Sequence, residues 1–119
     1  MARIVEGTIE RQLSFSSLTV EIRRLGSDFQ VTVWGGDRPH IGCCVLAVPR
    51  ASLTGDGSVS VTSSVLNVTG HKDEQICRYL AEKIAVREQA AVVCSGGFHV
   101  DGITREQIKE VLQAVEEMI

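Results

Sequence analysis

Three short segments of the chain each combine a histidine with glycine and charged side chains, and they hold the residue types best suited to chemistry. The segments are residues 35–42, 69–74 and 95–102. Histidine exchanges protons and ligates metals near neutral pH, and glycine lets a ligand approach the main chain closely. Each segment follows a predicted strand, and loops in such places carry function more often than strands do.

The second segment has the composition of an anion-binding turn. A helix is expected to begin near Asp73, and a helix N-terminus presents unpaired N–H groups with a partial positive charge. Gly70 would admit the anion, and Lys72 would add a point charge. A plain strand-to-helix turn with a solvated lysine accounts for the same residues, so the two interpretations stay open.

The third segment has a carboxylate close to its histidine. His99 and Asp101 are two residues apart, so in an extended backbone they lie on one side and can form a carboxylate–imidazole pair. Such a pair serves proton transfer or metal ligation. A structural histidine bonded to its own loop is the competing interpretation.

The first segment places Arg38 and His40 after a Gly-Gly turn, and Pro39 biases Arg38 towards an extended backbone. A loop tip with solvated charges also explains this segment.

A divalent metal site is open as well, although the sequence has no helical i, i+4 pair of ligands to support one. Its candidate ligands are His40, His71, His99 and Asp101.

Hydrophobic periodicity predicts the strands that must position these segments. Apolar residues alternate with polar ones over residues 18–33, interrupted by turn residues, which predicts a β-hairpin. A continuous apolar run predicts a buried strand over residues 43–48, and alternating valines predict another over residues 58–68. A short buried strand is expected over residues 90–94.

Two amphipathic helices complete the predicted fold. An apolar stripe predicts a helix from about Asp73, and a capping box of Thr104 and Gln107 opens a second one. We therefore predict a single α+β domain over residues 1–119, in the order ββββ-α-β-α, with a mainly antiparallel sheet and both helices packed on one face. The other sheet face lacks a predicted cover, which leads us to expect a homodimer.

Bulk composition excludes several classes of protein. The net charge is −3 and the basic residues are scattered, which argues against nucleic-acid binding. The sequence has neither an apolar stretch of membrane-spanning length nor a secretory signal, so we expect no membrane association and a cytoplasmic location. The four cysteines lack C-x-x-C spacing and lie in apolar runs or on a helix face, so we expect inert thiols in the core.

Taken together, residues 40–50, 70–74 and 97–101 resemble the LpdD-like family in order and separation. The resemblance implies a non-catalytic chaperone for prenylated FMN, which a separate flavin prenyltransferase would make. The chaperone would deliver this cofactor to a UbiD-type aromatic-acid decarboxylase, or mature it on that enzyme.

The resemblance also implies a set of cofactor-binding residues. The flavin phosphate would suit Lys72 and either Arg38 or Arg50. The ring system would need an apolar wall, for which Trp34, Ile41 and Phe98 are available. The complete set is Arg38, His40, Gly42, Arg50, Gly70, His71, Lys72, Asp73, Gly96, Gly97, Phe98, His99 and Asp101.

Two other classes of function stay open on the sequence alone. One is a small metal- or histidine-dependent hydrolase or isomerase that uses His71, or His99 with Asp101, as a general base. The other is a purely structural accessory subunit of a decarboxylase.

Overall fold

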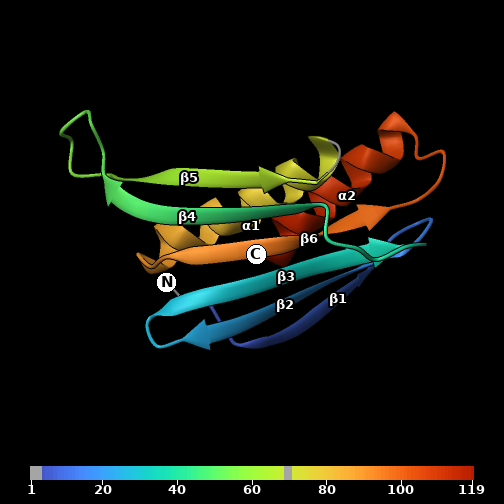
Figure 1. Cartoon of the computed structure of the whole chain (residues 1–119), viewed down its shortest axis with the longest axis horizontal. Helices are drawn as coiled ribbons and strands as arrows, with labels where there is room; N and C mark the ends of the chain where they lie inside the picture. Colours follow the sequence, from blue (N-terminus) through green and yellow to red (C-terminus); the bar gives the residue numbers. More distant parts are fainter. Residues whose placement is uncertain (1–3, 69–70) are drawn as a thin grey trace.

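The computed structural model describes residues 4–68 and 71–119, without the side chains of residues 71 and 72. The described residues form a six-stranded sheet and two helices (Figure 1). The strands are β1 (Gly7–Gln12), β2 (Ser17–Leu25), β3 (Asp28–Gly36), β4 (Cys43–Ala51), β5 (Val59–Asn67) and β6 (Val92–His99). The helices are α1 (His71–Glu88) and α2 (Arg105–Met118).

The sheet has the strand order β1-β2-β3-β6-β4-β5, in which only the pair of β3 and β6 is parallel. Both helices lie behind the sheet in Figure 1, and no described element covers the face turned towards the viewer. The predicted α+β class, the mainly antiparallel sheet and the placing of both helices on one face are therefore confirmed.

The edge strand β1 was not predicted from the sequence. It pairs with β2 in antiparallel register, with Ile9 opposite Val20. Most of its residues are exposed, so it shows little of the apolar alternation that identifies a half-buried strand. Its position is decided by backbone pairing with β2 rather than by burial of its own side chains.

The core lies between the sheet and the helices. The apolar stripe predicted for α1 is buried, and its residues are Ile76, Cys77, Leu80, Ala81 and Ile84. The predicted capping box is present at the start of α2, where the Thr104 side chain accepts from the Gln107 N–H and the Gln107 side chain accepts from the Thr104 N–H. These two features confirm the helices that the sequence predicted.

The central strand β6 is longer than predicted and continues to His99. Gly96, Gly97 and Phe98 therefore lie in a strand rather than in a connection, which corrects the expected boundary. The reason is pairing on the β3 side, where the parallel ladder runs as far as Gly36 opposite His99. Because β3 and β6 are parallel, both end at the same edge of the sheet, where β4 and α1 begin (Figure 1).

Within the described ranges, neither α1 nor α2 has the length and apolar character needed to cross a lipid bilayer.

Candidate functional site

Residues from three distant parts of the chain meet at the end of the sheet where β3 and β6 finish. The rings of His40 and His99 stand nearly perpendicular, at 85°, with their centroids 6.1 Å apart. The backbone N–H of Asp37 donates to the carbonyl of His99 (2.7 Å), and that of Gly42 donates to the carbonyl of Gly96 (2.8 Å). The hydrogen bond between Asp37 and His99 was not predicted from the sequence. The glycine pairs near the ends of β3 and β6 could have suggested that the two backbones approach closely there. We call Arg38, His40, Asp73, His99 and Asp101 the histidine cluster.

Asp73 contributes a buried carboxylate from the first turn of α1, and its side chain is only 3% exposed. The ladder between β4 and β6 ends at the pair of Cys43 and Gly96. Beyond that point the N–H of Phe98 donates to Asp73 Oδ1 at 2.9 Å. The helix dipole favours a negative charge in this first turn, and a buried carboxylate must find such partners. Asp73 thus ties α1 to the end of β6.

His40 is held at both of its ring nitrogens. Its Nδ1 lies 3.0 Å from the carbonyl oxygen of Arg38, and its Nε2 lies 3.2 Å from Asp73 Oδ2. A carbonyl oxygen only accepts, so Nδ1 must carry a proton. Nε2 faces Asp73 Oδ2, an oxygen that can accept a hydrogen bond from it.

Gly42 and Gly97 make room for this pair. A Cβ atom on Gly42 would overlap Asp73 Oδ2 and lie 3.0 Å from His40 Nε2. A Cβ atom on Gly97 would lie 2.9 Å from His40 Nε2 and 3.1 Å from Asp73 Oδ2. Contacts this short are repulsive, so a larger residue at either position would displace the side chain of His40 or Asp73. The space left by the missing side chains is filled by His40 and Asp73.

Of the two interpretations of the third segment, the structure shows the contact expected for a carboxylate–imidazole pair. His99 Nε2 lies 2.8 Å from Asp101 Oδ1, and Arg38 Nη2 lies 3.4 Å from Asp101 Oδ2. The hydrogen bond from His99, followed by the positive charge of Arg38, lowers the pKa of the Asp101 carboxyl below its usual value. Asp101 is therefore a carboxylate at neutral pH and acts only as an acceptor.

The amino-acid sequence from residue 14 to residue 119 matches the family model described as the prenylated flavin chaperone LpdD-like domain. The matched range holds the whole histidine cluster and every element except β1. The chain belongs to the LpdD-like family. This confirms the resemblance found in the histidine segments.

A solved structure with a related fold is a chain in the crystal structure of a chaperone complex for yeast 20S proteasome assembly. It shares 12% sequence identity and a TM-score of 0.51 with this LpdD-like domain, and the superposition covers 97% of this chain and 98% of that chain. At this identity the likeness concerns the fold alone. A comparison with curated proteins finds no significant match to the sequence.

Some predicted cofactor-binding residues of the LpdD-like domain lie away from the cluster. Arg50 is near the far end of β4, on the order of 20 Å along the strand from Cys43. Its Nε donates to Thr62 Oγ1 at 2.9 Å. Phe98 is fully buried and packs edge-to-face against Phe15, with ring centroids 5.9 Å apart. The Phe98 side chain therefore belongs to the core, and only its backbone takes part in the cluster.

The two other aromatic or apolar candidates are nearer the surface. Trp34 is half-buried and lies opposite Gly97 in the register of β3 and β6. Ile41 is 66% exposed in the connection between β3 and β4. Both positions are compatible with contact to a ligand at this end of the sheet.

The anion-binding turn predicted at Gly70, His71 and Lys72 lies at the limit of what the structure describes. Gly70 and the side chains of His71 and Lys72 are outside the described residues. The backbone of α1 does begin at His71, in agreement with the predicted helix start. The role of these three residues in binding an anion therefore stays a prediction.

The described side chains do not form a metal site. Leaving aside His71, no group of three or more His, Cys, Asp or Glu residues is arranged to hold a metal ion. His40 already contacts Asp73, and His99 already contacts Asp101, so these residues form two separate pairs. For the described ligands, the geometry favours paired hydrogen bonding over coordination.

The cysteines are all free, and three of them, Cys43, Cys77 and Cys94, are buried. Burial, followed by the nearby Cys77 thiol and the charge of Glu74, raises the pKa of the Cys43 thiol to about 12. Burial also raises the pKa of Cys94 well above its usual value. Thiols in this state are poor nucleophiles, as predicted for Cys43 and Cys94. The same prediction of a core position is wrong for Cys44, which is only partly buried because alternate side chains of β4 face away from the helices.

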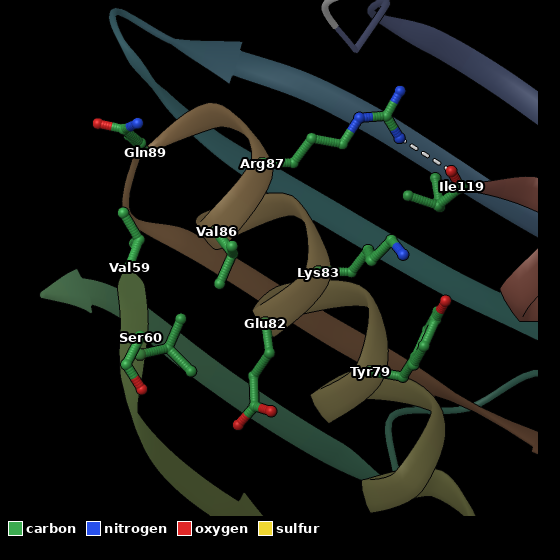
Figure 2. A pocket seen from close by; sticks show the side chains of 10 residues that line it. Val59, Ser60, Tyr79, Glu82, Lys83, Val86, Arg87, Gln89 and Ile119 are labelled. Carbon is green, nitrogen blue, oxygen red and sulfur yellow. Dashed lines mark hydrogen bonds between the residues drawn. The ribbon is translucent and has the colours of Figure 1, made fainter. Parts of the chain in front are cut away.

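A hollow of about 860 Å³ lies between β5 and the C-terminal half of α1 (Figure 2). Val59 borders it on β5, Val86 and Lys83 border it on α1, and Ile119 lies at its side. This is the end of α1 opposite Asp73. The hollow is therefore separate from the histidine cluster.

Proposed function

We propose that this protein is a non-catalytic chaperone that binds prenylated FMN and delivers it to, or matures it on, a UbiD-type aromatic-acid decarboxylase. The observation that supports this most is the meeting of the histidine segments at one end of the sheet, in a chain that belongs to a prenylated-flavin chaperone family. A flavin prenyltransferase would supply the cargo. The free thiols favour a reducing cytoplasmic location for both steps.

The chemistry at the cluster suits such a cargo. The phosphate of FMN needs cationic or N–H donors, and Arg38 lies at the rim of the cluster with 71% of its side chain exposed. The start of α1 lies beside the cluster, because Asp73 in its first turn contacts His40. Trp34 and Ile41 offer apolar surface for the ring system near the same end of the sheet. Lys72, in the first turn of α1, is the proposed second cation at the phosphate.

Co-expression with a flavin prenyltransferase tests this function. The purified wild-type protein should carry a flavin absorbance spectrum, and Lys72→Ala should bind prenylated FMN at least tenfold more weakly, because a charge-assisted hydrogen bond contributes about 1.5–3 kcal/mol. Lys109→Ala, on the exposed surface of α2, is the matched control and should bind as the wild type does.

Two results would count against this function. The first is a wild-type protein that retains no flavin under these conditions. The second is stable co-purification with the decarboxylase that survives replacement of all three histidines, together with undiminished maturation of that enzyme. The second result would favour a purely structural accessory subunit.

We further propose that the uncovered sheet face pairs with a second copy of the chain. On β4 the side chains of Cys44, Leu46 and Val48 alternate with the buried ones and point away from the helices. Leu66 lies opposite Cys44, and Val93 lies opposite Leu46, which extends an apolar patch across three strands. A whole face of six strands of this length has an area on the order of 800 Å², about what each partner contributes to a standard interface, and the patch occupies the half formed by β4, β5 and β6.

A charge in this patch should dissociate the pair. Leu46→Glu would place a carboxylate in the middle of two packed sheets, so we expect a monomer at concentrations where the wild type sediments as a dimer. Leu53→Glu, in the 90% exposed position of the β4–β5 loop, is the control and should not change the mass measured by sedimentation equilibrium. A wild type that is monomeric at about 100 μM would contradict the proposed pairing.

A further inference from the structure

We infer that the two histidine–aspartate pairs have different roles. His99 forms a hydrogen bond with the flavin cargo through Nδ1. His40 and Asp73 have a structural role and do not bind the cargo. This inference rests on the proposed function and assigns a role to individual atoms of the site. The cargo group that fits is a hydrogen-bond donor, and the imide N–H of the flavin ring is such a group.

His40 has no ring nitrogen left for a ligand. Nδ1 donates to the Arg38 carbonyl, and Nε2 faces the Asp73 carboxylate, whose other oxygen accepts from Phe98 N–H. A ligand could reach a nitrogen of His40 only by breaking one of these bonds. The close packing of Gly42 and Gly97 against this pair also leaves the ring little freedom to turn.

His99 differs because only one of its nitrogens is used. Nε2 contacts Asp101 at 2.8 Å, whereas Nδ1 has no hydrogen-bond partner within the described part of the chain. The His99 side chain is 40% exposed, so the ring lies at the surface, where a ligand can approach it. In the described cluster, it is the imidazole nitrogen best placed to bind a cargo.

Asp101 determines whether Nδ1 of His99 donates or accepts a hydrogen bond. Because a carboxylate only accepts, the neutral His99 ring must carry its proton on Nε2. Nδ1 then has a lone pair and accepts a hydrogen bond. Asp101 is therefore a positioning residue, and Arg38 at 3.4 Å holds its other oxygen.

Paired substitutions of His99 test the assignment to one nitrogen. An asparagine side chain places its amide near the position of Nδ1, whereas a glutamine side chain reaches the position of Nε2. We expect His99→Asn to bind prenylated FMN within about threefold of the wild type, and His99→Gln to bind about tenfold more weakly, as for the loss of one hydrogen bond. Titration of the purified variants with prenylated FMN, followed by absorbance, measures both affinities.

The Asp101→Asn variant tests the role of the tautomer. Arg38 would hold the amide oxygen, so the amide N–H would face His99 Nε2 and move the ring proton to Nδ1. Binding should weaken about tenfold, because an acceptor has become a donor. In the ligand-free proteins, at a pH where the ring is neutral, ¹⁵N chemical shifts of His99 should show Nε2 protonated in the wild type and Nδ1 protonated in the variant. Glu116→Gln, an exposed change on α2, is the control for both measurements.

The possible outcomes separate this inference from the proposed function. If the wild type binds prenylated FMN, the proposed function is supported. The inference would still be overturned if His99→Asn and His99→Gln bound with equal affinity, or if the neutral His99 ring of the wild type carried its proton on Nδ1. A wild type that binds no prenylated FMN would overturn both. Weaker binding by His99→Gln and Asp101→Asn, with unchanged unfolding curves, is the result that supports the inference.

Discussion

Replacing Asp73 with alanine should lower the free energy of unfolding by roughly 2–4 kcal/mol. The substitution leaves the buried Phe98 N–H without its acceptor and removes the partner of His40 Nε2. It also removes a negative charge from the first turn of α1, where the helix dipole favours one. Urea unfolding of the two proteins, analysed by linear extrapolation, measures the difference.

Asparagine at the same position provides a matched control. Its amide oxygen can accept from Phe98 N–H, and its amide N–H can donate to His40 Nε2 once that nitrogen is unprotonated. We therefore expect Asp73→Asn to recover most of the stability that Asp73→Ala loses. An alanine variant as stable as the wild type would contradict the structural role assigned to Asp73.

Phe98→Ala should destabilise the protein by about 3–5 kcal/mol. The Phe98 side chain is fully buried beside Leu18 and Phe15, and truncating it would leave a cavity that the surrounding strands can fill only in part. Any loss of flavin binding by this variant should follow from unfolding. At a temperature where it remains folded, its affinity for prenylated FMN should stay within about threefold of the wild-type value.

Leu53→Ala is the control for truncation of a large apolar side chain. Leu53 is 90% exposed, so its removal should leave the free energy of unfolding within about 0.5 kcal/mol of the wild-type value. If the folded Phe98→Ala variant had lost all affinity for the flavin, the phenyl ring of Phe98 would have to contact the cargo. That outcome would contradict the placing of Phe98 in the core.

Much of the fold could be predicted from the sequence because its elements bury one face each. The stripe through Ile76, Leu80 and Ile84 predicts α1, and alternation through Leu18, Val20 and Ile22 predicts β2. The capping box of Thr104 and Gln107 predicts the start of α2. These signals are local in the chain, since burial repeats with the period of the element itself. β1 lacked such a signal, because an edge strand with exposed side chains is specified by its neighbour.

The candidate site could be predicted only in part. The sequence alone identified the three histidine segments and the family they resemble. It also offered the pairing of His99 with Asp101, two residues apart, as one of two interpretations of the third segment. It did not separate the roles of His40 and His99, because the partner of His40 is Asp73, far along the chain on another element.

Tertiary structure alone decided that both ring nitrogens of His40 are hydrogen-bonded within the protein, whereas among the described residues only Nε2 of His99 has a partner. The physical reason is the parallel pairing of β3 with β6, which brings both strand ends to the edge of the sheet where α1 begins. Asp73 can then take the place of a missing strand partner for Phe98 and fill the space left by two glycines. The same packing turns the Phe98 side chain into the core and leaves Arg50 at the far end of β4. Such long-range placements depend on strand order, which local periodicity does not encode.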